Sequence, residues 1–156
     1  MNLGLESTYE GCKNQPGYVD QDSETGIIYF GRRNRETVVN TVESSYLFNH
    51  KISLTFRMRH YHSKAEYMSF FELLQNGNLA PSDYNGNHDI NYNAFNIDLT
   101  MRWNFAPGSE ILFNWKNAIY TNDQLTQNNY WQNLTSTIDE SQVNSISLKI
   151  IYYFNI

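Results

Sequence analysis

Hydrophobic and polar residues alternate along most of the chain, most clearly in the segment 94–120. Between 95 and 105 the odd positions carry Phe, Ile, Leu, Met, Trp and Phe, whereas the even positions carry Asn, Asp, Thr, Arg and Asn. After the turn sequence Pro107-Gly108-Ser109 the alternation resumes. A period of two over about ten residues is typical of a β-strand, and Pro-Gly-Ser is typical of a turn. The segment therefore predicts a hairpin of two strands, 94–105 and 109–120.

The same period predicts four more strands. In the third of them the even positions from 52 to 58 carry Ile, Leu, Phe and Met, and the odd positions from 53 to 59 carry Ser, Thr and two Arg. These strands are expected at about 2–11, 36–48, 51–63 and 142–155. Six strands joined in sequence order predict an all-β fold with an antiparallel up-and-down sheet, and residues 1–156 form one domain.

The connections between these strands alternate in length. Two are short, at 49–50 and 106–108, whereas three are long and rich in Asn, Asp, Gly, Ser and Gln. The long loops lie near 12–35, 64–93 and 121–141. Their apolar stretches, 26–30 and 66–74, are expected to extend strands or form small hairpins, and 66–74 could instead form a short helix. Short turns at one end and long loops at the other are typical of outer-membrane β-barrels, with the short turns in the periplasm.

Composition alone does not decide whether the chain is a membrane protein or a soluble protein. The chain has 12 Tyr, 9 Phe and 3 Trp, but only 17% charged residues. A mean hydropathy of −0.59 suits a soluble protein, yet barrels also have low hydropathy because half of each strand faces a polar lumen. The net charge of −5 without a basic cluster excludes a nucleic-acid footprint, and one Cys excludes a disulfide framework. The first residues lack the features of a signal peptide.

The outcome depends on what the apolar face contacts. In a barrel its aromatic residues contact lipid and gather near the periplasmic interface. The predicted lipid-facing aromatic residues are Tyr46, Phe48, Phe95, Trp103, Phe105, Phe113, Trp115, Tyr152 and Phe154. In a soluble sandwich the same face would be the protein core.

The opposite face carries charged residues of both signs. In a barrel they point into the lumen, where they pair across strands and fix the register. A polar constriction that selects solutes is the more specific alternative. The predicted lumen-facing polar residues are Glu43, Arg57, Arg59, Asp98, Arg102, Glu110 and Lys116.

No pattern indicates catalysis. His60 and His62 have a spacing that suits two metal ligands on one strand face, but no third ligand lies nearby in sequence. The loop 82–91 alternates Asp and Asn as calcium sites do, yet it lacks the EF-hand pattern. Nucleophile triads, phosphate loops and paired carboxylates are not recognisable. We therefore expect no enzyme, no metal and no cofactor.

Three stretches carry a resemblance to a known family. They are FGRRNRETVVNTVESSYLFNHKISLTFRMRHYHS (30–63), NHDINYNAFNIDLTMRWNFAPGSEILFNWKNAIY (87–120) and SISLKIIYYFNI (145–156). Together they resemble the C-terminal β-barrel of a family of Bacteroidota outer-membrane proteins with a domain of unknown function. That family commonly carries an N-terminal carbohydrate-binding domain similar to family 9 modules, which has no counterpart here. The resemblance implies location more than activity.

Six strands are fewer than the eight that a closed membrane barrel needs. We expect this chain to be the C-terminal portion of a bacterial outer-membrane barrel, completed by strands from a longer chain; the alternative is that the loops supply two more strands. The expected role is anchoring, surface display or transport linked to glycan use, with membrane lipid and a glycan as partners. The competing hypothesis is a soluble all-β carbohydrate-binding module that uses Tyr84, Tyr130 and Trp131.

Overall fold

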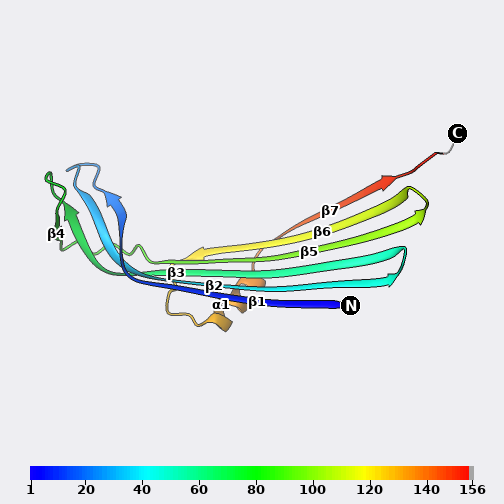
Figure 1. The fold of residues 1–156 in the computed structure, drawn as a ribbon. Coiled ribbons are helices and arrows are strands. Elements are labelled where there is room, and N and C mark those ends of the chain that lie inside the picture. The colour runs from blue at the N-terminus through cyan, green and yellow to red at the C-terminus, as the bar shows by residue number, and fades with distance from the viewer. Residues whose placement is uncertain (155–156) are drawn as a thin grey trace.

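Seven strands form one antiparallel sheet in the computed structural model, which describes residues 1–154 (Figure 1). The sheet order is β1-β2-β3-β5-β6-β7, with the short β4 paired to β3, so neighbours in the sheet follow one another in the sequence. The predicted antiparallel up-and-down sheet is confirmed. The strands are β1 (Asn2–Gln21), β2 (Ile28–Asn49), β3 (Ile52–Leu73), β4 (Leu79–Pro81), β5 (Ile90–Ala106), β6 (Ser109–Asp123) and β7 (Gln142–Ile151).

The sheet is open. Within residues 1–154, β1 and β7 each pair on one side only, and β1 does not pair with β7. The loops supply the three residues of β4 but not the two further strands that would close a small barrel. Both edges therefore present unpaired backbone groups.

The strands extend further than alternation predicted. The expected loops at 12–35 and 64–93 are largely strand, because β1 runs to Gln21, β2 begins at Ile28 and β3 runs to Leu73. Segment 66–74 is thus mainly strand rather than helix. Polar and apolar residues are mixed on both faces there, so period two is lost although the strands still pair. A 2.7 Å ion pair between Glu10 and Arg35 is one such cross-strand contact. The expected end of the last strand at position 155 lies outside the described residues, and β7 ends at Ile151.

Short polar turns close the hairpins. Asn49 accepts hydrogen bonds from the backbone N–H groups of the two residues after His50. Gly108 adopts a φ of +72°, a left-handed conformation that glycine tolerates best, in the turn between β5 and β6. At the opposite end of the sheet, Asp22 accepts from the backbone N–H groups of Thr25 and Glu24, and these bonds hold the pKa of its carboxyl below the usual value.

One helix accompanies the sheet in the described part of the chain. Helix α1 (Tyr130–Ile138) interrupts the expected loop at 121–141 and lies against one face of the sheet. The loop ends of β1, β2 and β3 turn away from α1, toward the other side of the sheet (Figure 1). No helix within residues 1–154 is long and apolar enough to cross a membrane.

The strands extend unequally past the level of α1. A row of cross-strand partners at this level contains His60, Phe95 and Ile119. From this row β3 continues 13 residues to Leu73, whereas β5 continues five to Ile90. β6 continues four residues past the row, and β7 begins within it because its first residue pairs with Ile119. At the loop end, β3 therefore extends far past the His60 row, whereas β7 does not extend past it.

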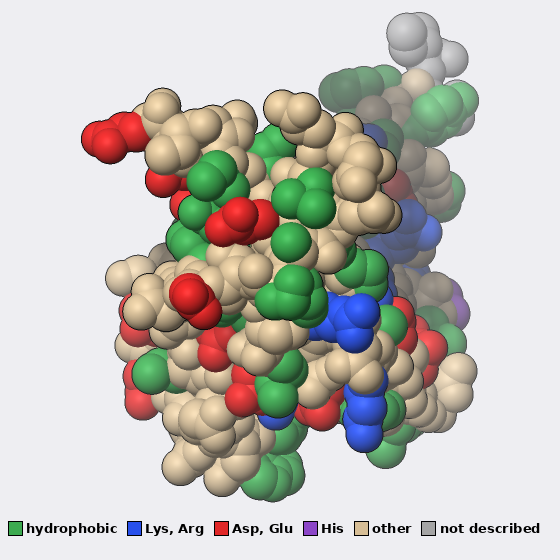
Figure 2. Space-filling view, turned by 90° about the vertical axis from the view of Figure 1, so that its left-hand side faces the viewer, with side chains coloured by type: hydrophobic (Ala, Val, Ile, Leu, Met, Phe, Trp, Pro, Cys, Tyr) green, Lys and Arg blue, Asp and Glu red, His purple; other side chains and the backbone are tan. Residues whose placement is uncertain are grey.

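The sheet has very little apolar core. Ala65, Ala94, Phe95 and Ile119 are the buried hydrophobic residues among those described. We call the part of the sheet between the His60 row and the short turns at 49–50 and 106–108 the turn half. Apolar side chains there stay exposed, and Leu5 and Ile146 have 75% and 69% of their surface accessible to solvent. Figure 2 views the loop end, where apolar side chains form small separate groups among polar and acidic ones. The large exposed apolar surface thus belongs to the turn half of the sheet.

Candidate functional site

A row of charges with alternating sign crosses four strands. Glu43, Arg57, Asp98 and Lys116 are successive cross-strand partners on β2, β3, β5 and β6. Arg57 Nε lies 3.2 Å from Glu43 Oε1, and Lys116 Nζ lies 3.7 Å from Asp98 Oδ1. Each pair contributes roughly 0.2–1 kcal/mol, because these side chains are about half exposed. The row therefore favours the observed register over slipped pairings that would oppose like charges.

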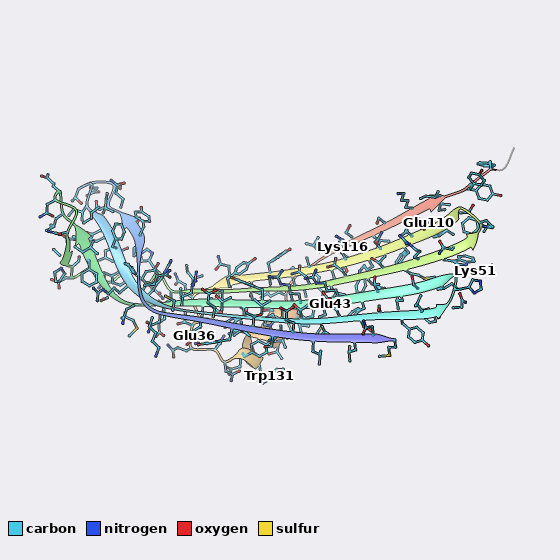
Figure 3. All side chains as sticks on the ribbon, viewed as in Figure 1. Glu36, Glu43, Lys51, Glu110, Lys116 and Trp131 are labelled. Carbon is cyan, nitrogen blue, oxygen red and sulfur yellow. The ribbon has the colours of Figure 1, made fainter. Side chains whose placement is uncertain are left out.

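All seven predicted polar residues share the face of this row. Arg59 partners Thr41 and Asn96 on it, and Arg102 Nε lies 3.5 Å from Glu110 Oε2. In Figure 3 Glu110 and Lys116 lie on the opposite side of the sheet from Trp131 of α1. We call this surface the charged face and the surface under α1 the helix face.

Aromatic residues at the turn end of the helix face form two groups of ring contacts. Tyr46 and Phe48 meet edge to face with ring centroids 4.8 Å apart. A second chain of ring contacts, with centroids 4.6–6.1 Å apart, joins β5 to the residues after β7. We call the two groups together the turn-end belt: Tyr46, Phe48, Trp103, Phe105, Tyr152 and Phe154. These are six of the nine aromatic residues that the sequence predicted to face lipid.

The three others occupy different positions on the helix face. Phe113 and Trp115 lie on β6 opposite Met101 and Leu99, and Trp115 Nε1 donates to a β7 side chain at 2.9 Å. Phe95 is different, because it lies level with α1 and is only 8% exposed. The prediction that Phe95 contacts lipid is therefore wrong for this residue: alternation gives its face correctly but cannot show that a helix from a distant segment covers it.

The loop half of the helix face is polar, and α1 docks there. The Tyr130 hydroxyl accepts from Asn40 Nδ2 at 2.8 Å and lies 2.9 Å from His60 Nδ1. Farther along α1, Asn133 Oδ1 accepts from Asn91 Nδ2 at 2.9 Å. We call these sheet residues the polar seat: Asn40, His60, His62, Asn91 and Asn93.

The two histidines of the polar seat are structural in this arrangement. His62 Nδ1 lies 2.8 Å from Asn93 Oδ1, and His60 Nδ1 faces the Tyr130 hydroxyl. Both imidazoles are almost fully buried. Within residues 1–154, no three side chains of His, Cys, Asp or Glu come together as metal ligands. The H-x-H spacing therefore positions groups for docking of α1.

Sequence reasoning missed α1, although a local signal was present. Asn129 Oδ1 accepts from the backbone N–H of Gln132, and Gln132 Oε1 accepts from the backbone N–H of Asn129. This reciprocal pair is a capping box, a recognised signature of a helix N-terminus. The low hydrophobicity of the following residues concealed it, because the buried side of α1 is polar.

The Asp- and Asn-rich loop 82–91 also has a structural role. Asp89 accepts from the backbone N–H of Tyr67 through Oδ1 and from Thr126 through Oδ2. Tyr84 stacks on Tyr29 with centroids 4.3 Å apart, and its hydroxyl lies 2.6 Å from an imidazole nitrogen. These contacts pin the loop onto the end of the sheet.

Comparisons place the chain in a family but do not supply a function. No curated protein and no solved structure shows significant similarity to it. A family model for a domain of unknown function, DUF5916, matches residues 1–156, which is the whole chain, and the protein therefore belongs to that family.

Proposed function

We propose that this chain is the membrane-spanning C-terminal portion of a bacterial outer-membrane β-barrel. The observation that carries the proposal is the contrast between the two faces of the turn half. The charged face bears paired ions, whereas the helix face exposes apolar side chains from β1 to β7. A barrel accounts for both, because one face meets lipid and the other meets a polar lumen.

The exposed apolar surface is too costly for water. Burying one Leu, Ile or Phe side chain stabilises a protein by about 1.5–3 kcal/mol. Eight such side chains therefore represent on the order of 15 kcal/mol, as much as the whole stability of a domain. The turn half of the helix face exposes at least eight large apolar residues: Leu3, Leu5, Tyr46, Phe48, Trp103, Ile146, Leu148 and Ile150. Contact with lipid removes this cost.

The open edges of β1 and β7 supply the second support. Unpaired edges do not persist in lipid, since each unsatisfied backbone group costs several kcal/mol there. We propose that further strands from a longer chain pair with these edges and complete the wall. The role that follows is anchoring, surface display or transport, linked to glycan use in a Bacteroidota outer membrane. Membrane lipid and a glycan are the partners; nucleic acid, a cofactor and a catalytic step have no part in it.

A soluble carbohydrate-binding module is the second candidate. Trp131 favours it, because an indole with 71% of its surface exposed offers a platform for a sugar ring. The other two aromatic residues of that hypothesis are already engaged. Tyr130 docks α1 on the sheet, and Tyr84 stacks on Tyr29.

Cell fractionation separates the two candidates. The full-length protein should remain in the outer-membrane fraction after an alkaline carbonate wash. It should also migrate differently on gels with and without heating, as folded barrels do. Release into the soluble fraction, together with binding to insoluble polysaccharide, would support the carbohydrate-binding module and contradict the barrel.

A further inference from the structure

We propose that α1 is an interfacial element that seats Trp131 in the boundary between headgroups and acyl chains of the outer leaflet. This inference rests on the proposed barrel, because it places the helix face outward. The occupant of the exposed surface of α1 is then lipid rather than a protein or a sugar.

The buried side of α1 is polar, unlike that of a typical helix of a soluble protein. The side packed on the sheet carries Asn133 and Thr137, which are 2% and 0% exposed, together with the Tyr130 hydroxyl. The outward side carries Trp131 and the partly exposed Ile138, together with the exposed polar residues Gln132, Thr135 and Ser136. Water favours the reverse, with apolar residues inward. The arrangement suits an outer surface that meets the apolar side of an interface.

The level of α1 matches the height of a membrane. Phe105 lies in the turn-end belt, and Phe95 lies in the row where Tyr130 docks, ten residues away on the same strand. Ten residues span about 34 Å along a strand. With strands tilted by about 40°, the vertical distance is about 26 Å, against about 25 Å for the apolar band of outer-membrane barrels. Such bands are flanked by aromatic girdles at both interfaces, and α1 supplies aromatic residues where the second girdle is due.

The helix also solves a problem of the sheet beneath it. At the level of α1 the strands place the polar seat on the helix face. Farther toward the turns, the same face is the one that we propose contacts lipid. Exposing such groups to hydrocarbon without hydrogen bonds is strongly unfavourable. α1 covers them with matching polar groups, and residues 124–138 carry no Asp, Glu, Lys or Arg. The helix itself is thus uncharged where the membrane begins, and Asp123, just before this segment, accepts from Asn91 Nδ2 at 2.9 Å.

The three tryptophans of the chain allow a direct test, because they occupy three levels. Trp103 lies in the turn-end belt, Trp115 lies midway between that belt and the Phe95 row, and Trp131 lies on α1. We would prepare three variants of the full-length protein, each keeping one of these three Trp residues and replacing every other Trp with Phe. Each would be reconstituted into phosphatidylcholine vesicles whose acyl chains carry bromine at a shallow or a deep position. Bromine quenches an indole only at contact distance.

The expected pattern is symmetrical. Trp115 should lose most emission with deep bromine, whereas Trp103 and Trp131 should lose most with shallow bromine and little with aqueous acrylamide. Quenching of Trp103 and Trp115 without quenching of Trp131 would overturn this inference and leave the barrel intact. Absence of bromine quenching at all three would overturn the proposed function, and the inference with it.

Discussion

Replacing Tyr130 with Phe tests how α1 is held. One hydroxyl serves two partners, since Asn40 Nδ2 lies 2.8 Å and His60 Nδ1 lies 2.9 Å from it. Phe keeps the ring and its packing, so the loss is confined to two hydrogen bonds. Each contributes about 1 kcal/mol, and leaving buried polar groups unsatisfied costs about 1–3 kcal/mol each. His60 is 3% exposed and its Nε2 already has no hydrogen-bond partner within residues 1–154, so compensation by water is hindered.

We therefore expect docking of α1 to weaken by about 2 kcal/mol. Because about 1.4 kcal/mol corresponds to a tenfold change in an equilibrium constant, the population of undocked α1 should rise roughly 30-fold. Hydrogen–deuterium exchange measured by mass spectrometry should show this acceleration for amides of α1 and none for the turn half of β5. Tyr120→Phe is the matched control, because Tyr120 is more than half exposed on the charged face. Equal exchange in the two variants would refute the view that hydrogen bonds to the polar seat hold α1.

Three further changes probe the sheet itself. Asp98→Lys places three like charges in the cross-strand row, and we expect a loss of about 1 kcal/mol that shrinks in 1 M salt, measured as the unfolding midpoint at two salt concentrations; an unchanged midpoint at low salt would contradict the pairing. Gly31→Ala would bring a Cβ into steric conflict with the Tyr67 ring, so about 1–3 kcal/mol should be lost and faster exchange should be confined to the loop end; normal exchange there would show that the ring moves freely. Trp103→Asp should abolish membrane assembly whereas Thr100→Asp should be tolerated, because an odd separation along the strand puts the two residues on opposite faces. Heat-modifiable gel migration of both variants would measure assembly, and equal tolerance would favour the soluble module.

Alternation predicted the part of the fold where the two faces differ. In β5 and β6 the apolar and polar positions fall on opposite faces, and a short turn fixes the partner strand. The seven residues of the charged face followed from period two, and the order of the sheet followed from the succession of strands and the short turns between them. This worked because chemistry at those positions depends on the side of the strand rather than on distant segments.

The rest depended on partners far away in the sequence. Strand pairing beyond Gly11 and Ser63 rests on backbone hydrogen bonds between segments that mix polar and apolar residues on both faces, and these bonds leave no period in the sequence. The burial of Phe95 depends on α1, which begins 35 residues later. Position along a strand gives the direction of a side chain, but only the tertiary structure shows what covers it.

The unequal rim of the sheet determines from which side a large molecule can reach the charged face. From the row of His60, β3 rises for about 44 Å along the strand at 3.4 Å per residue, whereas β7 begins at that row. The long loop ends of β1, β2 and β3 also curve away from α1 and over the charged face (Figure 1). The long ends of β1 to β3 would block a polymer that approached the charged face from the loop end of these strands. A polymer that approached over β6 and β7 would not meet this obstruction. Among the strands described, the charged face is therefore most accessible over β6 and β7.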